Sequence, residues 1–372
     1  MRIAITLQSL HHFGGIGTYT RHLIRHILEL DKNNEYILIY PSFGKAKQSF
    51  GQYQNRDNVT EVYSPSLIPH SNYWDHFVVP NVAHRHRVDL VFNPFISIPW
   101  FGRFKKVFVA HNSEWFTMPE VFRTFNRLTG SWRLKALMKE ADIVISVSQK
   151  VAEDLIHATG LPRSKFRVIY NAPSAEFQPV TDAQRLAAVQ KKYALPEAFF
   201  LFVGGIYPQK NFSGLLTAFA EAAPHIPHRL VVAGSGRWKS SKDLSMIQQL
   251  GLQDRVQLIG WIEHDELPIL YNLATAFLIP SFHESCSVAL LEALACGCPV
   301  IASNTGGNPE VVADAALLID PRNTAELQQA MLQIVAQPAL RTVLAQRGLE
   351  RAKLFTWDKA ARETLHVFQE LN

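Results

Sequence analysis

The chain has 372 residues, a length that accommodates two domains with a hydrophobic core each. Hydrophobic residues make up 47% of it and charged residues 19%, which is typical of globular proteins and excludes disordered or collagen-like chains. No apolar run approaches the ~18 residues of a membrane span, and residues 1–7 predict a first strand rather than a secretory signal.

The formal net charge of +5 is unevenly distributed. Residues 1–172 hold 21 Lys and Arg against 13 Asp and Glu, a balance of +8, whereas residues 173–372 hold 16 against 19, a balance of −3. We therefore expect the first half to meet an anionic partner. A membrane surface, a lipid diphosphate and a nucleic acid are all candidates for this partner, and net charge alone does not choose between them.

The three cysteines, Cys286, Cys296 and Cys298, lie close together in the sequence. They have too few potential ligands nearby for a zinc site, so packing is the favoured use. Free thiols agree with a reducing cytoplasm.

In the first half, the strand at residues 1–7 leads into the segment Gly14-Gly15-Ile16-Gly17, and an amphipathic helix follows from about Tyr19 to Leu30. A glycine-rich loop before a helix favours close approach of the backbone to a phosphate, although a simple tight turn explains it equally well. The GGIG spacing is not that of a dinucleotide fingerprint.

Strands are predicted at residues 36–40, 90–92, 106–110 and 143–148. His111 follows one of them directly, at the position where open α/β sheets bind ligands, with a capping or core histidine as the alternative. Residues 123–139 form a basic helical pattern, which indicates either a solvated helix or a peripheral membrane contact. Further basic residues nearby are Arg85, Arg87, Arg103, Lys105 and Lys106.

The second half opens with a strand at 199–203, followed by a turn at Gly204-Gly205. Lys210 then stands beside a helix start, which suits a diphosphate clamp. Gly234 also follows a strand, but the third glycine of a dehydrogenase fingerprint is absent. Strand and helix patterns alternate onward, which predicts an α/β fold.

Two glutamates mark residues 281–311. A buried strand is expected at 276–280, and Ser285 occupies the expected N-cap of a helix that ends at Gly297. Glu284 precedes this helix and Glu292 lies within it, ~10 Å further along its axis. Helix-surface glutamates are the ordinary alternative for such a pair.

Residues 281–311, with Thr305-Gly306-Gly307-Asn308-Pro309-Glu310 at the end, resemble the donor-site signature of the retaining glycosyltransferases of family 4. This resemblance implies the GT-B fold, an α/β arrangement of two Rossmann-like, doubly wound parallel-sheet domains facing each other across a cleft. The expected domains are 1–173 with a crossover helix at 356–372, a linker at 174–181, and a donor-binding domain at 182–355.

The resemblance also implies roles for individual residues. Glu284 would bind the transferred sugar, Glu292 the ribose, and Lys210 the diphosphate, while His111 would lie near the sugar and the acceptor. The other expected donor contacts are Gly15, Ile16, Gly17, Gly205, Asn211, Gly234, Trp261, Ile262, Ser285, Cys286, Ser287 and Val288. Four further residues carry less weight: Asn112, Ser148, Arg237 and Lys239.

The chain departs from the family pattern at three places. Asn112 replaces the aspartate that commonly follows the histidine, and Gly205 stands where an arginine is frequent. Residues 285–287 are Ser-Cys-Ser where Gly-Phe-Gly is usual. One diphosphate cation is therefore missing, and the side chains at 285–287 are expected to alter donor preference.

We expect a retaining, metal-independent glycosyltransferase without a cofactor, since no Asp-x-Asp motif follows a strand. The expected donor is UDP-glucose or a related UDP-hexose, with GDP-mannose as the rival. The expected acceptor is a glycan or lipid-linked saccharide of bacterial type, met in the cytoplasm at the inner membrane face. A nucleotide-sugar hydrolase or epimerase and a non-enzymatic binding protein are the alternatives; a nucleic-acid binder would leave the glutamates unexplained.

Overall fold

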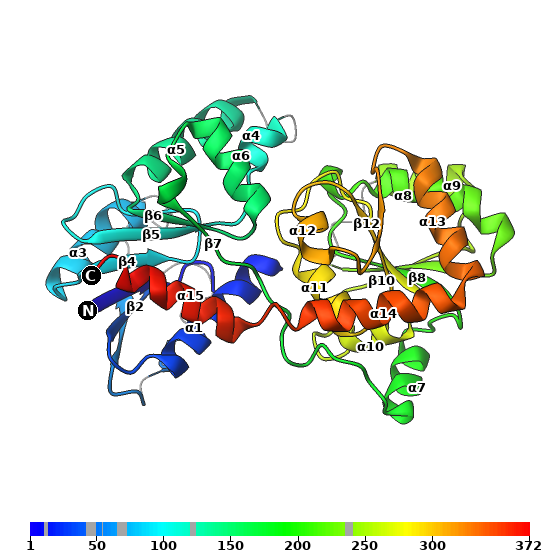
Figure 1. Cartoon of the computed structure of the whole chain (residues 1–372), viewed down its shortest axis with the longest axis horizontal. Helices are drawn as coiled ribbons and strands as arrows, with labels where there is room; N and C mark the ends of the chain where they lie inside the picture. Colours follow the sequence, from blue (N-terminus) through cyan, green and yellow to red (C-terminus); the bar gives the residue numbers. More distant parts are fainter. Residues whose placement is uncertain (11–13, 42–49, 54, 65–72, 120–123, 235–240) are drawn as a thin grey trace. The chain divides into compact units, whose positions relative to one another are not determined.

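The computed structural model describes all residues except 11–13, 42–49, 54, 65–72, 120–123 and 235–240. The chain forms two compact units (Figure 1). Unit 1 comprises Met1–Asn171 and Trp357–Asn372, and unit 2 comprises Ala172–Thr356. Each contains one parallel sheet with helices, so the predicted pair of Rossmann-like α/β domains is confirmed.

The sheet of unit 1 has seven strands, all parallel, in the order β3-β2-β1-β4-β5-β6-β7. Its central strands are continuous apolar runs because both faces are covered, as parallel sheets require. The edge strand β3 was not predicted, since its partly exposed residues lack that signal. The strands are β1 Arg2–Thr6, β2 Glu35–Pro41, β3 Val59–Ser64, β4 Leu90–Asn93, β5 Lys105–Ala110, β6 Ile143–Ser146 and β7 Phe166–Val168.

Unit 1 carries α-helices of very different lengths and a short π-helix, η2. The first helix begins at Gly15, not near Tyr19 as predicted, with Gly14 at φ 83° as its N-cap residue. The predicted glycine loop at 14–17 is therefore mostly a helix start. The helices are α1 Gly15–Leu30, η2 Trp74–Val78, α3 Val79–Arg85, α4 Glu114–Thr117, α5 Thr124–Glu140, α6 Gln149–Thr159, η4 Arg163–Lys165 and α15 Trp357–Gln369.

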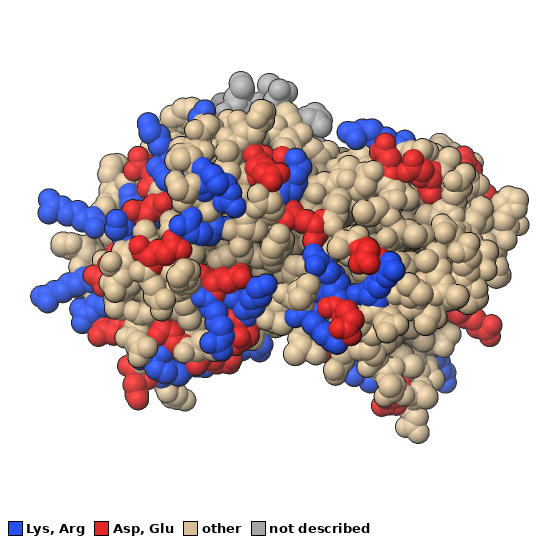
Figure 2. Space-filling model, in the orientation of Figure 1, with Lys and Arg blue, Asp and Glu red and all other residues tan. Residues whose placement is uncertain are grey.

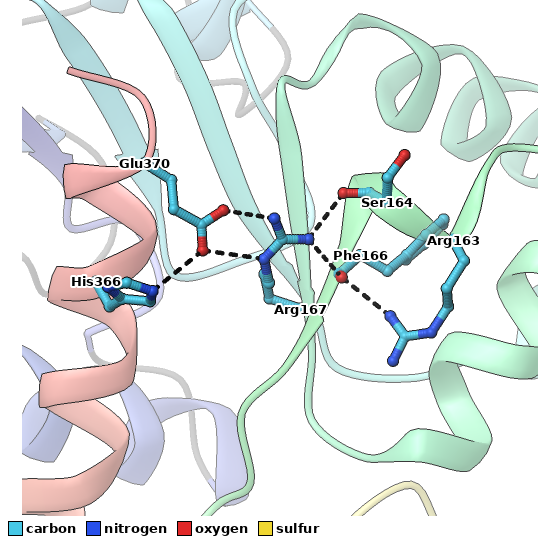
Figure 3. A network of polar contacts seen from close by, with 6 residues as sticks. All are labelled: Arg163, Ser164, Phe166, Arg167, His366 and Glu370. Atoms are coloured by element: carbon cyan, nitrogen blue, oxygen red, sulfur yellow. Dashed lines mark hydrogen bonds and ion pairs between the residues drawn. The ribbon is translucent and has the colours of Figure 1, made fainter.

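The last helix, α15, returns to unit 1 and packs beside α1 (Figure 1). The Trp357 ring meets Tyr19 at 5.6 Å between centroids, and Phe368 meets Phe92 at 5.2 Å. Beyond the helix, Glu370 accepts from Arg167 Nε at 3.1 Å, and Arg167 also donates to Ser164 O at 2.8 Å (Figure 3). Aromatic packing and this ion pair join the C-terminus to β7 and the core of the sheet.

The sheet of unit 2 has six strands, all parallel, in the order β10-β9-β8-β11-β12-β13. The strands are β8 Phe199–Val203, β9 Arg229–Ala233, β10 Val256–Gly260, β11 Ala276–Ile279, β12 Val300–Ser303 and β13 Leu317–Ile319. The helices are α7 Ala183–Lys192, η5 Pro208–Lys210, α8 Phe212–Ala222, η6 Ala223–His225, α9 Ser241–Gln249, α10 Leu267–Leu273, α11 Val288–Ala295, α12 Asn308–Val312, α13 Thr324–Ala336 and α14 Pro338–Ala352.

The prediction that Ser285 caps the helix after β11 is wrong. Helix α11 begins at Val288, and its N-cap residue is Ser287. The Gly307 amide donates to the Glu284 carbonyl at 2.7 Å, which supports a loop at Glu284 instead of an earlier helical turn. The predicted end is correct: Gly297, at φ 68°, follows the C-cap.

Both sheets have a point at which the chain order reverses, between β1 and β4 in unit 1 and between β8 and β11 in unit 2. Loops after the two strands diverge there, and open α/β sheets bind ligands in the resulting crevice. These points decide where functional side chains can gather. Across the described residues, no helix is long and apolar enough to cross a membrane.

Candidate functional site

Lys210 and Glu284 meet at the reversal point of unit 2. Lys210 ends η5, after β8, and Glu284 lies in the loop after β11, the neighbouring strand. The Lys210 Nζ lies 2.6 Å from Glu284 Oε1, and the Ser281 hydroxyl donates to the same oxygen at 2.6 Å. The two charged side chains are 22% and 9% exposed, so the pair is partly shielded but reachable.

The backbone of Glu284 is held by the two glycines of the Thr-Gly-Gly segment. A Cβ on Gly306, at φ 61°, would lie 2.2 Å from the Glu284 carbonyl oxygen. Gly307 donates its amide to that same carbonyl, and the Thr305 hydroxyl donates to Ser281 O at 3.2 Å. These contacts give Gly306 a structural reason, because only a bare backbone fits at that position against the loop that carries Glu284.

Glu292 lies on α11 in a different environment. Its side chain is buried, and the Tyr271 hydroxyl donates to Oε2 at 3.3 Å. Burial raises the pKa of Glu292 to about 8, against the lowering effect of the Tyr271 hydrogen bond. At neutral pH this side chain is therefore mostly an uncharged acid, able both to donate and to accept a hydrogen bond.

Several predicted donor contacts in unit 2 have local structural tasks. The Asn211 amide caps α8 by accepting from Gly214 N at 3.2 Å, and it donates to Pro321 O at 2.7 Å. A Cβ on Gly234 would lie 2.3 Å from the Gly204 carbonyl oxygen, so glycine is needed where the loops after β8 and β9 touch.

Gly205, which replaces a frequent arginine, is also matched to its surroundings. A Cβ there would lie 2.5 Å from the ring of Tyr207. The tyrosine ring therefore occupies the space in which a side chain at 205 would begin. Arg237 and Lys239, two of the further donor contacts expected from the sequence, lie outside the described residues.

The remaining predicted contacts of unit 2 differ in exposure. Cys286 and Ser287 are 6% and 8% exposed, and Ser285 and Val288 are half-buried. After β10, Trp261 is 56% exposed whereas Ile262 is buried. The indole is therefore placed for contact with a ligand or solvent rather than for core packing.

In unit 1, His111 lies directly after β5. Its Nε2 lies 2.8 Å from the Pro94 carbonyl oxygen, so Nε2 carries the proton because a carbonyl only accepts. The ring of Tyr19 contacts the imidazole edge-on at 4.8 Å. Asn112 beside it is half-buried.

Two other predictions of unit 1 fall on helix starts. Gly15, Ile16 and Gly17 form the first turn of α1, whose amides have no partner within the helix itself. Ser148 is fully buried and caps α6 by accepting from Val151 N at 3.2 Å, which is a local role. The predicted site residues thus form two groups, one in each unit.

Sequence reasoning missed Ser281 and Tyr271, which contact the two glutamates. Ser281 follows a buried strand closely, and this position could have indicated it. Tyr271 lies on α10, and no sequence signal connects it with Glu292. Among the described residues, no group of three metal-binding side chains is found.

Comparison with known proteins identifies the class. A family described as Glycosyltransferase Family 4 matches residues 13–176, and one described as Glycosyl transferases group 1 matches residues 187–351. Together they account for both units. The chain belongs to the family 4 glycosyltransferases of the GT-B type.

Curated relatives agree with this class. The O-antigen chain mannosyltransferase B of Escherichia coli is 27% identical over 269 residues, which cover 72% of this chain and 71% of the relative. A serotype-specific mannosyltransferase WbdA of Escherichia coli is 28% identical over 292 residues, which cover 75% of this chain but only 34% of the relative. The chain therefore spans about a third of the length of the second enzyme.

Solved structures show the same fold. Sucrose-phosphate synthase from Thermosynechococcus elongatus superposes with a TM-score of 0.76 at 21% identity, over 100% of this chain and 99% of that one. Anabaena HepE, solved in complex with UDP and glucose, gives 0.77 at 18% identity, over 100% of both chains. At these identities the likeness concerns the fold alone.

Proposed function

We propose that the protein is a retaining glycosyltransferase that moves a hexose from a nucleotide diphosphate sugar to a saccharide. The observation that carries this proposal is the Lys210–Glu284 pair at the reversal point of unit 2. A carboxylate that accepts from sugar hydroxyls and an ammonium that pairs with phosphate oxygens are the groups such a donor needs side by side.

Glu284 and Lys210 have different roles in the proposed reaction. Glu284 positions the sugar, and Lys210 stabilises the charge that develops on the leaving diphosphate. A bound diphosphate would compete with Glu284 for the Lys210 ammonium, so donor binding loosens one ion pair while it forms another. The first-turn amides of α11, which have no partner within the helix itself, supply further donors to the diphosphate.

Retention is assigned to a front-face mechanism. Double displacement by two carboxylates requires groups about 5 Å apart. Glu292 lies on α11, where Tyr271 contacts it, whereas Glu284 contacts Lys210 and Ser281. In the front-face mechanism the leaving phosphate accepts the proton of the acceptor hydroxyl as the new bond forms, and Glu292 binds the ribose.

The donor we propose is a UDP-hexose such as UDP-glucose. GDP-mannose is the second candidate, because both curated relatives described above are named as mannosyltransferases. The Ser285-Cys286-Ser287 segment before α11 is one of the places where the chain departs from the family pattern. We propose that this segment contributes to the choice between the two donor sugars.

We further propose that the reaction needs no divalent metal, because Lys210 and helix amides supply positive charge to the diphosphate. A chelator such as EDTA should leave the initial rate unchanged. A rate that falls to background with EDTA and returns with added Mg²⁺ or Mn²⁺ would contradict this part of the proposal.

The acceptor we propose is a glycan or lipid-linked saccharide, met in the cytoplasm at a membrane surface through unit 1. The large exposed aromatic side chains of unit 1 include Phe77, Phe101 and Trp132. On the face seen in Figure 2, basic and acidic side chains are interspersed over this unit. In a co-sedimentation assay with vesicles of anionic lipid, the protein should pellet with the vesicles. Trp132→Ala should reduce the fraction of protein in the pellet.

Real-time proton NMR of the full-length protein with UDP-glucose, GDP-mannose and an oligosaccharide acceptor library tests the proposal. A transferred hexose with the anomeric configuration of the donor is the expected result. Inversion would overturn the retaining mechanism. Release of free sugar or of an isomer at the same rate without acceptor would favour a nucleotide-sugar hydrolase or epimerase.

A further inference from the structure

Unit 1 contains a cavity of about 150 Å³ at the carboxyl edge of its sheet. One water needs only ~10–15 Å³ of such volume, so the space admits a small ligand. Gln8, which follows β1, and Ser97, which follows β4, both line it. The cavity therefore lies at the reversal point of this sheet, where α/β folds bind ligands.

A buried carboxylate lines the cavity. Asp75, on the π-helix η2, is 1% exposed and receives the Gln8 amide at 3.1 Å on Oδ1 and 3.3 Å on Oδ2. Burial raises the pKa of Asp75 to about 6, while Ser97, Gln8 and the charge of Arg133 oppose that rise. A carboxylate accepts about four hydrogen bonds, so Asp75 has capacity for a hydroxyl donor beyond Gln8 and Ser97.

An aromatic side chain, Trp115, also lines the cavity. Trp115 lies on α4, which packs against α5 (Figure 1), and a Cβ on Gly130 of α5 would lie 2.4 Å from its indole ring. Glycine is unfavourable inside a helix, and the ring contact explains its presence there. The absence of a side chain at Gly130 therefore lets the indole ring approach the helix closely.

The loop after β4 connects the cavity with His111. The imidazole contacts the Pro94 carbonyl at 2.8 Å, and the next three residues, Phe95–Ser97, line the cavity. Trp115, on α4, follows His111 by four residues in the chain. The residue assigned to the sugar and the acceptor therefore shares its supporting loops with the cavity.

We propose that this cavity binds one neutral hexopyranosyl unit of the acceptor, with Asp75 and Gln8 on its ring hydroxyls and Trp115 against its C–H face. Paired amide and carboxylate groups match vicinal hydroxyls, and an indole matches the apolar face of a pyranose. An anionic ligand fits less well, because the buried Asp75 would repel it and Arg133 supplies only one opposing charge. The inference rests on the proposed transferase function and names its acceptor subsite.

The test is an NMR titration of the full-length protein with methyl α-glucopyranoside, methyl α-mannopyranoside and methyl α-galactopyranoside, and with inorganic phosphate. The wild type should bind at least one hexoside. Asp75→Asn, which keeps the shape, should weaken that binding about tenfold, the effect of a lost charged hydrogen bond. Gly130→Ala should also weaken it, because the added methyl displaces the Trp115 ring.

Asp142→Asn is the matched control. Asp142 accepts from Lys106 N at 2.9 Å just before β6, at the opposite edge of the same sheet, so hexoside binding should be unchanged. The inference is overturned if no hexoside binds the wild type, if Asp75→Asn binds as tightly as the wild type, or if phosphate alone binds.

Titration of Asp75→Asn with UDP-glucose and GDP-mannose separates this inference from the proposed function. Donor affinity should match the wild type, because Asp75 belongs to unit 1 and Lys210 with Glu284 to unit 2. If Asp75→Asn also lost affinity for the donor, the assignment of this cavity as an acceptor subsite would be contradicted. Hexoside binding without any transfer would instead count against the transferase proposal alone.

Discussion

At the scale of single residues, the unit 2 site depends on one carboxylate with two partners. Glu284 accepts from Lys210 and from Ser281 at the same oxygen. Its other oxygen is available to a sugar hydroxyl in the proposed mode of binding. The site therefore combines the Glu284 carboxylate, which its hydrogen bonds hold in place, with the Lys210 ammonium, which can pair with a diphosphate.

Glu284→Ala should lower kcat by at least about 100-fold, because a positioned charged contact in a shielded site contributes ~3 kcal/mol to the transition state. Steady-state kinetics with the best donor measures the change. Glu350→Ala is the matched control, since Glu350 is an exposed glutamate of the same unit whose ion pair is with the exposed Lys353. Equal rates for the two variants would remove Glu284 from the mechanism.

Glu292 makes stability depend on pH. Its pKa is about 8 in the folded protein against a reference value of 4.5, so the folded state binds more protons between these values. Stability should fall as pH rises from about 4.5 to 8, by a few kcal/mol at ~1.4 kcal/mol per pKa unit. Urea unfolding at pH 5 and pH 8.5 measures this loss.

Glu292→Gln should flatten that pH profile, because the amide stays neutral, and it should weaken donor binding through loss of the ribose contact. Tyr271 can still donate to the amide oxygen, so the fold should be kept. A variant with the same pH slope as the wild type would show that Glu292 is not the group that titrates.

At the scale of elements, the site is made by the register of neighbouring loops. Lys210 and Glu284 are 74 positions apart and meet only because β8 and β11 pair in the sheet. The Phe282 amide also donates to Gln209 O at 2.8 Å, which ties the two loops together. The glycines after β12 then hold the Glu284 loop from the other side.

Gly306→Ala should lower activity strongly while the protein remains folded, because its Cβ would lie 2.2 Å from the Glu284 carbonyl oxygen. Gly297→Ala provides the comparison. It has a similar φ of 68°, but its nearest neighbours are Leu349 side-chain atoms at 3.4 Å. Both variants carry the roughly 1–2 kcal/mol cost of a left-handed alanine. Gly306→Ala adds a clash with the backbone of Glu284, so its thermal unfolding should shift further than that of Gly297→Ala, and only Gly306→Ala should lose turnover.

Sequence patterns predict strands and the loops after them well, because buried parallel strands are continuous apolar runs. They predict His111 directly after a strand, Lys210 beside the start of a helix, and Glu284 just before a helix. Sequence patterns do not distinguish side chains that bind a ligand from side chains that stabilise the local backbone. Asn211 and Ser148, both predicted as donor contacts, cap helices in the structure. Nor could sequence patterns locate the start of α11, which tertiary contacts to Glu284 set, or reveal Asp75, whose position depends on an irregular π-helix.

At the scale of the whole molecule, the chain ends in the unit where it began. The α15 helix contributes Trp357 and Phe368 to the core of unit 1, and the Arg167–Glu370 pair lies at its end (Figure 3). Exposed ion pairs stabilise little, about 0–1 kcal/mol, so the aromatic contacts are the main attachment.

Phe368→Ala should destabilise unit 1 by about 3–5 kcal/mol, since the side chain is fully buried against Phe92. Hydrogen exchange should accelerate in α1 and α15 and leave the strands of unit 2 unchanged. Arg362→Ala, which removes an exposed ion pair on the same helix, should change stability by less than about 0.5 kcal/mol. Equal loss of protection in both units would contradict the assignment of α15 to unit 1.

Isothermal titration of the wild type and Lys210→Ala with UDP-glucose and GDP-mannose tests the central claim, that the Lys210–Glu284 pair is the donor site. The wild type should bind at least one of these donors, and Lys210→Ala should bind it at least about tenfold more weakly, through loss of the charged contact to the diphosphate. Failure of the wild type to bind either sugar nucleotide, or equal affinity in the variant, would contradict it.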